Sequence, residues 1–132
     1  MLLLAFEHLG EAKPFLDHFN AQKAHGIYFS DGTAIYVNYG KGGLSLALNI
    51  ARLSEQLKPE LCVLFGLAGN LSNLNIGEVV VVNKVKLLDS SLNPILNPIE
   101  INSIKGFKNV DCLSVLGNYA VSYTHLRAHE TG

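Results

Sequence analysis

The sequence predicts an α/β protein with an open sheet. Two unbroken apolar runs, Leu2 to Phe6 and Leu61 to Phe65, have the length of strands buried on both faces of a parallel sheet. Between them lies a helix-length apolar run that ends at Leu57. One glycine-rich turn precedes this helix and another follows the second strand, and ligands of open α/β sheets bind at the carboxyl ends of the strands. The stretch from Asn38 to Val82 therefore organises the chain.

The composition is typical of a globular chain rich in core residues. Of its 132 residues, 48% are hydrophobic and 16% are charged, and the formal net charge is -1. This size suits one domain, and this charge gives no basic surface for nucleic acid or an anionic membrane. The apolar opening lacks a basic segment and is broken by Glu7, unlike a signal peptide, and no apolar run reaches the ~20 residues of a membrane span. We expect a cytoplasmic protein.

The cysteines and histidines do not predict a metal site. Cys62 and Cys112 are isolated, and each lies in an apolar run, which predicts buried free thiols. His8, His18 and His25 lack the spacing of metal ligands. We expect neither a metal nor a cofactor.

The first third of the chain predicts a helix and a hairpin after the opening strand. Glu7 to Gly10 forms an exit loop, and Glu11 to Phe19 forms a helix with Pro14 in its first turn, where the missing N–H does no harm. Its apolar face consists of Ala12, Phe15, Leu16 and Phe19. The alternation from Gly26 to Asn38, with Asp31-Gly32 at its centre, predicts two antiparallel strands joined by a tight turn.

The central helix is apolar around most of its circumference. It follows the turn Gly40-Lys41-Gly42-Gly43 and ends at Lys58-Pro59-Glu60. One apolar stripe consists of Leu46, Ile50, Leu53 and Leu57, and a second consists of Leu44, Ala47, Leu48 and Ala51. Such a helix is covered on more than one side. We expect it to pack on the sheet and also against further sequence or a second subunit.

The second half of the chain has a weaker pattern. Asn70 to Gly77 is a polar connection, and a strand from Glu78 to Val82 continues past a bulge to Leu88. The last strand candidate is Asp111 to Leu116.

The last twelve residues, Val121 to Gly132, break with the preceding pattern. The string V-S-Y-T-H-L-R-A-H-E-T-G resembles the translation of a transposase-based sequencing adaptor, and such scars are set aside in fold reasoning. His125, His129 and Glu130 are therefore not read as a metal site. We assign residues 1–120 to a partial domain and residues 121–132 to the adaptor, and we expect the native gene to continue in another frame beyond Tyr119.

Each candidate motif is ambiguous by itself. Gly40-Lys41-Gly42-Gly43 lies at a helix amino terminus, which favours anions, but its spacing matches neither a phosphate loop nor a dinucleotide fingerprint. Gly66-Leu67-Ala68-Gly69 follows a strand, as structural glycines often do. Glu7 and Glu11 follow the first strand, near the expected carboxyl edge of the sheet, but a solvated loop acid and a first-turn glutamate near a helix dipole would give the same pattern.

Five sequence blocks in a fixed order are more specific than these motifs. They are A-F-E-H-L-G-E-A-K-P-F, G-K-G-G, K-P-E-L, G-L-A-G-N and N-L-N-I-G-E-V-V-V-V. From about Leu2 to Asp89, the chain thereby resembles the purine nucleoside phosphorylase and nucleosidase superfamily, and most closely its methylthioadenosine/S-adenosylhomocysteine nucleosidase and futalosine hydrolase branch. The resemblance implies a three-layer α/β/α sandwich with a mixed central sheet, truncated here, and a homodimer in the full-length protein. The implied activity is hydrolysis of the N-glycosidic bond of a purine nucleoside or thionucleoside, a small-molecule substrate.

The resemblance also implies roles for particular residues. Glu11, in E-A-K-P-F, matches the glutamate that activates water, and Glu7 is its rival because the interval from Ala5 to Glu11 is longer than in the family. The residues implied to contact the nucleoside are Phe6, Gly40, Lys41, Gly66, Leu67, Ala68 and Gly69. Asn70 replaces a glycine that is common in the nucleosidases.

Two alternatives to hydrolysis remain. Phosphorylases of this superfamily commonly carry a phosphate-binding arginine where this chain has Leu64, so water is favoured over phosphate. The family's ribose-binding Met-Glu segment, and the aspartate that protonates the leaving purine in the family, have no match before Val121. We therefore expect the 132-residue chain to be inactive, and the second alternative is a non-catalytic domain that binds a nucleoside or a partner protein. Which nucleoside is used stays open.

Overall fold

The chain folds into two compact units, each with its own sheet. The computed structural model describes residues 1–69 and 71–115, and the units are Met1–Leu67 and Ala68–Gly132. None of the helices in the described ranges is long and apolar enough to cross a membrane.

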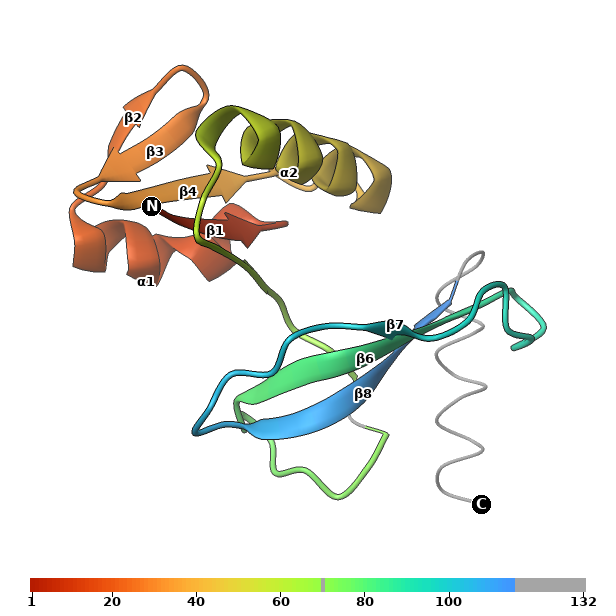
Figure 1. Cartoon of the computed structure of the whole chain (residues 1–132). Helices are drawn as coiled ribbons and strands as arrows, with labels where there is room; N and C mark the ends of the chain where they lie inside the picture. Colours follow the sequence, from red (N-terminus) through yellow and green to blue (C-terminus); the bar gives the residue numbers. More distant parts are fainter. Residues whose placement is uncertain (70, 116–132) are drawn as a thin grey trace. The chain divides into compact units, whose positions relative to one another are not determined.

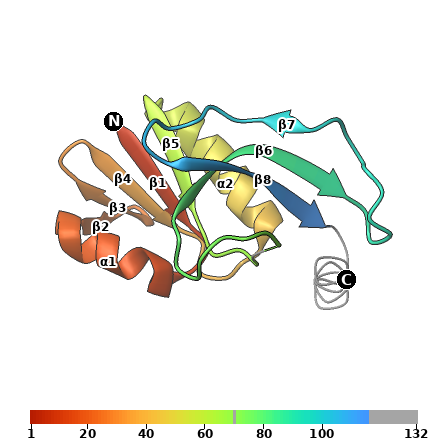
Figure 2. The same cartoon turned by 90° about the horizontal axis from the view of Figure 1, so that it is seen from below.

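The first unit contains a five-stranded mixed sheet in the order β2-β3-β4-β1-β5 (Figures 1 and 2). Strand β1 (Leu2–Phe6) pairs in parallel with β4 (Thr33–Val37) on one side and with β5 (Leu61–Phe65) on the other. Strands β3 (Ile27–Ser30) and β2 (Gln22–Ala24) extend the sheet beyond β4 in antiparallel fashion. The carboxyl ends of three parallel strands therefore lie side by side.

Helices cover both faces of this sheet. Figure 1 shows α1 (Leu9–Phe19) and α2 (Gly43–Leu57) on opposite sides of β1 and β4. Because side chains alternate along a strand, Leu3 faces the α2 side while Leu4 faces the α1 side. The core towards α2 consists of Leu3, Ile27, Ala34, Tyr36 and Leu53, with Leu46 and Leu57 against it. The core towards α1 consists of Leu4, Phe6, Ala12, Ile35 and Val37. The predicted three-layer α/β/α class with a mixed sheet is confirmed.

Three aromatic rings join α1 to the two neighbouring strands. Phe6 of β1 stacks on Phe65 of β5 with ring centroids 5.0 Å apart, and Phe15 of α1 lies 5.1 Å from Phe6 and 4.7 Å from Phe65. Offset and tilted aromatic contacts of this kind add stability beyond the buried area.

Helix α1 starts two residues earlier than its sequence pattern predicts. Its first turn is stabilised because the Glu11 carboxylate accepts a hydrogen bond from the His8 backbone N–H at 3.2 Å. The exit loop therefore shrinks to Glu7 and His8, and Pro14 lies inside the helix rather than in its first turn. The missing N–H of Pro14 thus removes one helical hydrogen bond, so that prediction was wrong. The predicted apolar face is confirmed, with Ala12 buried in the core towards α1 and Phe15, Leu16 and Phe19 packed against that core.

The hairpin and the central helix form as predicted. Strands β3 and β4 meet at Asp31-Gly32, where Gly32 has a φ of 71°. Helix α2 ends at Lys58, whose left-handed backbone lets its N–H bond to the Ser54 carbonyl at 2.9 Å. Of the two apolar stripes of α2, only the one that contains Leu53 packs on the sheet.

The predicted burial of Cys62 is wrong. Strand β5 is the edge strand of the five-stranded sheet, so Cys62 is exposed although its neighbours are apolar. Cys112 is half-buried, and both thiols are free as predicted.

The second unit contains a three-stranded sheet in the order β7-β6-β8. Strand β6 (Val80–Leu88) pairs in parallel with β8 (Lys108–Val115) and antiparallel with β7 (Ile99–Glu100). The predicted bulge is confirmed between Val82 and Lys84. Strand β6 begins two residues later than predicted and β8 three residues earlier, while Leu116 and the predicted adaptor lie outside the described residues.

Candidate functional site

The candidate site lies where β1 and β4 end. Phe6, the last residue of β1, is opposite Val37 of β4 and Phe65 of β5. The chain runs from β1 to β4 on one side and then returns across β1 to β5, so the strand order reverses at β1. Such a switch point is where open α/β sheets bind ligands. The structure thus brings the segments after β1 and after β4 together.

Backbone hydrogen bonds hold the turn after β4 against the end of β1. The N–H of Asn38 donates to the Phe6 carbonyl at 2.8 Å, and the N–H of Gly40 donates to the Glu7 carbonyl at 2.9 Å. Gly40 has a φ of 75°, and a Cβ there would lie 3.5 Å from Cε1 of His8. Glycine is therefore favoured at this position by its backbone conformation, and it allows His8 to lie against the turn.

The Glu7 side chain is part of the same assembly. Its Oε1 accepts a hydrogen bond from the Gly42 N–H at 2.9 Å, and its Oε2 accepts one from Nδ2 of Asn38 at 2.9 Å. Asn38 is fully buried, and its Nδ2 also donates to the Gly42 carbonyl at 2.9 Å. Hydrogen bonds that involve an ionised group are stronger than neutral ones. Glu7 is consequently fixed to the turn that precedes α2.

The other end of the Asn38 amide is bound by two hydroxyls. Tyr36 donates to Oδ1 of Asn38 at 2.7 Å, and Ser45 donates to the same oxygen at 3.1 Å. Burial raises the pKa of Tyr36, Arg52 works against this rise, and the charge of Glu7 adds to it. The Tyr36 hydroxyl therefore keeps its proton at neutral pH and acts as the donor to Asn38.

Glu11 has a different environment from Glu7. One of its oxygens caps α1 through the His8 N–H, and in the described ranges its other oxygen accepts no hydrogen bond. Both glutamates thus flank His8, but only Glu7 is bound to the turn after β4.

A second contact joins this turn to the β2–β3 hairpin. The hydroxyls of Tyr28 and Tyr39 lie 2.6 Å apart, and Nζ of Lys23 lies 5.5 Å and 5.4 Å from the centres of the two rings. The hydrogen bond with Tyr39 raises the pKa of Tyr28, and burial adds to this rise. Tyr39 has a φ of 55°, so the contact helps to hold a backbone conformation that is uncommon for tyrosine.

The remaining predicted site residues differ in position. The ring of Phe6 is fully buried in the aromatic contact with Phe65, so its contact with a nucleoside stays a prediction. Lys41 is exposed, Gly66 and Leu67 follow β5, and Leu67 is 92% exposed. Ala68 and Gly69 begin the second unit, and their contact with a ligand also stays a prediction.

The Glu7–Asn38 pair is a feature that the sequence patterns did not reveal. The two residues are 31 positions apart and share no motif. A polar residue that directly follows a buried strand was the one available signal, since Asn38 comes after the fully buried strand β4.

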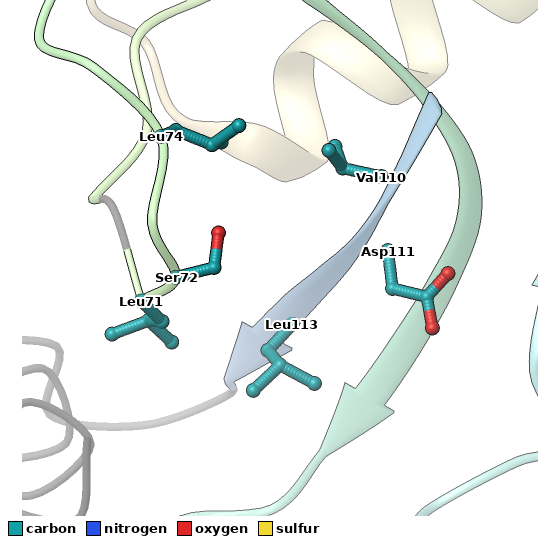
Figure 3. Close-up of a pocket in the computed structure, with 6 residues that line it drawn as sticks. All are labelled: Leu71, Ser72, Leu74, Val110, Asp111 and Leu113. Atoms are coloured by element: carbon teal, nitrogen blue, oxygen red, sulfur yellow. The ribbon is translucent and has the colours of Figure 1, made fainter. Parts of the chain in front are cut away.

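The second unit has a separate depression on its sheet (Figure 3). It is lined by Leu71, Ser72 and Leu74 from the connection before β6 and by Val110, Asp111 and Leu113 from β8. Asp111 forms an exposed ion pair with Lys86 at 3.4 Å. Most of the lining is apolar, and Ser72 and Asp111 are its polar side chains.

The described part of the chain has the α/β fold of the nucleoside phosphorylase type. No protein-family model and no curated protein matches the sequence. Among solved structures, the chain is similar to the MTA nucleosidase (MTAN) of Chlamydia trachomatis. A variant of that protein bound to MTA gives a TM-score of 0.62 at 21% identity, covering 88% of this chain and 60% of the other. The same nucleosidase bound to adenine gives a TM-score of 0.59 at 20% identity, with the same coverage.

These similarities define the fold and its extent. The chain spans 60% of the length of the nucleosidase structures that it matches. At about 20% identity, these matches show a shared fold. Activity must be argued from the residues of the site.

Proposed function

We propose that the full-length protein hydrolyses the N-glycosidic bond of a purine nucleoside or thionucleoside. The observation that carries the proposal is the meeting of Glu7, His8 and a glycine-rich turn at the carboxyl ends of β1 and β4, next to Glu11. Support comes from the fold, because structures with the same fold hold MTA and adenine.

The reaction needs a base and a polar support for positive charge. As the bond between the ribosyl carbon and the purine breaks, its electron pair leaves with the purine and the ribosyl carbon gains positive charge. A carboxylate that accepts a proton from water makes the oxygen nucleophilic, and this oxygen forms the new bond to that carbon. We assign water activation to Glu11, with Glu7 as the alternative. We assign the nucleoside contacts to Phe6, Gly40, Lys41, Gly66, Leu67, Ala68 and Gly69.

Water is favoured over phosphate as the nucleophile. Leu64 occupies the position at which phosphorylases of this superfamily carry an arginine, and it is 58% exposed on β5. An apolar side chain cannot bind phosphate in the bidentate manner of arginine.

The test uses the product of the complete gene, recovered by sequencing the locus. We expect MTA to yield free adenine at the same rate with and without added phosphate. A requirement for phosphate would identify a phosphorylase, and nucleoside binding without turnover would identify a binding protein. The absence of both binding and turnover with MTA, S-adenosylhomocysteine and futalosine would contradict the proposal.

Separate substitution of the two glutamates tests the assignment of the base. We expect Glu11→Gln in the full-length protein to lower kcat for base release by about a hundredfold or more, because general base catalysis contributes that much. Equal activity of Glu11→Gln, Glu7→Gln and the unaltered enzyme would discard both assignments.

We further propose that the full-length protein is a cytoplasmic homodimer. The second apolar stripe of α2 supports the dimer, because Leu44 is 77% and Leu48 is 63% exposed. Sedimentation of the full-length protein should give a dimer, and Leu44→Lys with Leu48→Lys should convert it to a monomer.

A further inference from the structure

Asn38 is a fully buried amide with every hydrogen-bonding position filled. Its two N–H positions serve Glu7 and the Gly42 carbonyl, and its oxygen accepts from Tyr36 and Ser45. A side-chain amide offers two donors on one end and one acceptor oxygen with two lone pairs on the other. Only an amide of this length satisfies both ends, since an aspartate would present an acceptor to Glu7 and to the Gly42 carbonyl.

The hydrogen bond from Asn38 helps to hold the Glu7 carboxylate against the turn. One of its oxygens accepts from the backbone N–H of Gly42 in the turn, and the other accepts from Nδ2 of Asn38, two residues before the turn. The Glu7 backbone carbonyl also accepts from the Gly40 N–H. Main chain and side chain of Glu7 therefore hold Gly40 and Gly42 of the turn, while Glu11 keeps one oxygen without a hydrogen bond in the described ranges.

We propose that Asn38 is a positioning residue that acts through Glu7, fixing the Gly40–Gly42 turn at the mouth of the nucleoside site. In this arrangement Glu7 anchors the turn and Glu11 activates water. The inference rests on the proposed function for its consequence in catalysis, but the anchoring itself can be tested without activity.

The first experiment measures backbone hydrogen exchange on the 132-residue chain. We expect Glu7→Gln to speed exchange of the Gly42 N–H by about tenfold or more, because its charged acceptor becomes at best a neutral amide oxygen and the new side-chain NH2 then faces a second donor, either the Gly42 N–H or Nδ2 of Asn38. The Leu4 N–H within β1 reports on the integrity of the sheet and should keep its protection. Gln56→Glu, the same amide-to-acid change on the exposed side of α2, serves as the control for Asn38→Asp and should leave Gly42 unchanged.

The double variant provides a rescue. In Glu7→Gln with Asn38→Asp, the new amide at position 7 can donate to the new carboxylate at position 38, which exchanges the donor and acceptor of the original pair. We expect Gly42 protection to recover in part relative to either single variant, as coupled residues do in a double-mutant cycle. Unchanged Gly42 exchange in Glu7→Gln would overturn the anchoring, and this result does not depend on whether Asn38→Asp folds.

The second experiment separates positioning from chemistry in the full-length enzyme. We expect Glu7→Gln to raise KM for the nucleoside more than it lowers kcat, whereas Glu11→Gln should lower kcat with little change in KM. A loss of kcat in Glu7→Gln with normal Gly42 protection would show that Glu7 is the base and would overturn the inference. If the full-length protein has no activity, the proposed function fails, while the exchange experiment still decides the anchoring.

Discussion

At the scale of single residues, the site depends on polar groups that are satisfied inside the protein. Tyr36 is buried on the α2 side of the sheet and donates a hydrogen bond to Asn38, which in turn holds Glu7. Removing one member leaves a buried partner unsatisfied, which costs about 1–3 kcal/mol. The network therefore makes the end of β4 sensitive to changes that preserve size and shape.

The raised pKa of Tyr36 predicts a loss of stability in alkaline solution. The folded state holds this proton more tightly than the unfolded state, in which the pKa is about 10. The stabilisation is therefore complete below about pH 10 and is lost as the pH rises through the folded-state value. Urea unfolding from about pH 8 to about pH 11 should show a steeper fall for the unaltered chain than for Tyr36→Phe. Parallel curves would show that Tyr36 does not contribute.

At the scale of elements, α2 has one packed stripe and one exposed stripe. Leu53 lies in the core and is 4% exposed, whereas the side chains of Leu44 and Leu48 on the second stripe are 77% and 63% exposed. The helix therefore has a larger apolar surface than the fold of the first unit requires.

The two stripes predict opposite results from substitution in the 132-residue chain. Leu53→Ala should lower the free energy of unfolding by about 2–5 kcal/mol, because it opens a cavity in the core. Leu44→Lys and Leu48→Lys should each change it by less than about 0.5 kcal/mol, as surface substitutions do. Chemical denaturation of the three variants provides the comparison, and a large loss in Leu48→Lys would contradict the assignment of an exposed stripe.

Local sequence pattern was sufficient for the elements with strong boundaries. Strands β1 and β5 and the end of α2 coincide with the predictions, because unbroken apolar runs meet glycine, proline or charged residues there. Strand β2 was missed because Gln22-Lys23-Ala24 is a short, exposed edge strand with no apolar alternation. The start of α1 was missed because His8, an unusual residue before a helix, precedes the first turn.

The sequence predicted where the candidate residues lie on the sheet but not the contacts between them. Glycine-rich turns at strand ends pointed to the carboxyl edge of the sheet, where the structure places Glu7 against the turn after β4, and the roles of Glu7 and Glu11 stay predictions. Their different environments depend on a hydrogen bond from Asn38, and only the parallel pairing of β1 with β4 brings that residue to Glu7. Sequence spacing does not specify such a long-range pair.

At the scale of the whole molecule, the two cores that pack against α1 and α2 use residues of the first unit alone. The residues that form the two cores of the first unit all lie between Leu2 and Phe65. Units of about 60 residues bury a smaller share of their surface than larger domains and are only marginally stable.

Because both of its cores lie within it, the first unit should fold when it is produced alone. We expect residues 1–67 to unfold cooperatively, with a free energy of unfolding of only a few kcal/mol, roughly at or below the low end for small domains. Circular dichroism during urea titration measures this, and hydrogen exchange should show protection in β1 and β4. A chain 1–67 without protection in β1 would show that the second unit is needed for folding.

The 132-residue chain itself should not release adenine from MTA. It spans 60% of the nucleosidase structures that it matches, and the resemblance implies that the groups that bind ribose and protonate the purine lie outside it. Chromatography after prolonged incubation of the pure chain with MTA provides the test. Measurable adenine above the rate of a Glu7→Gln, Glu11→Gln double variant would refute this prediction.

The position of β5 has a practical consequence for work with this chain. In the described ranges β5 pairs only with β1, so its other side presents backbone N–H and carbonyl groups beside exposed Leu61 and Leu64. An apolar edge of this kind can pair with the same strand of another molecule and so seed aggregation. Concentrated samples of the chain are therefore expected to form intermolecular sheets, and a lysine in place of Leu64 is the substitution best suited to keep them in solution.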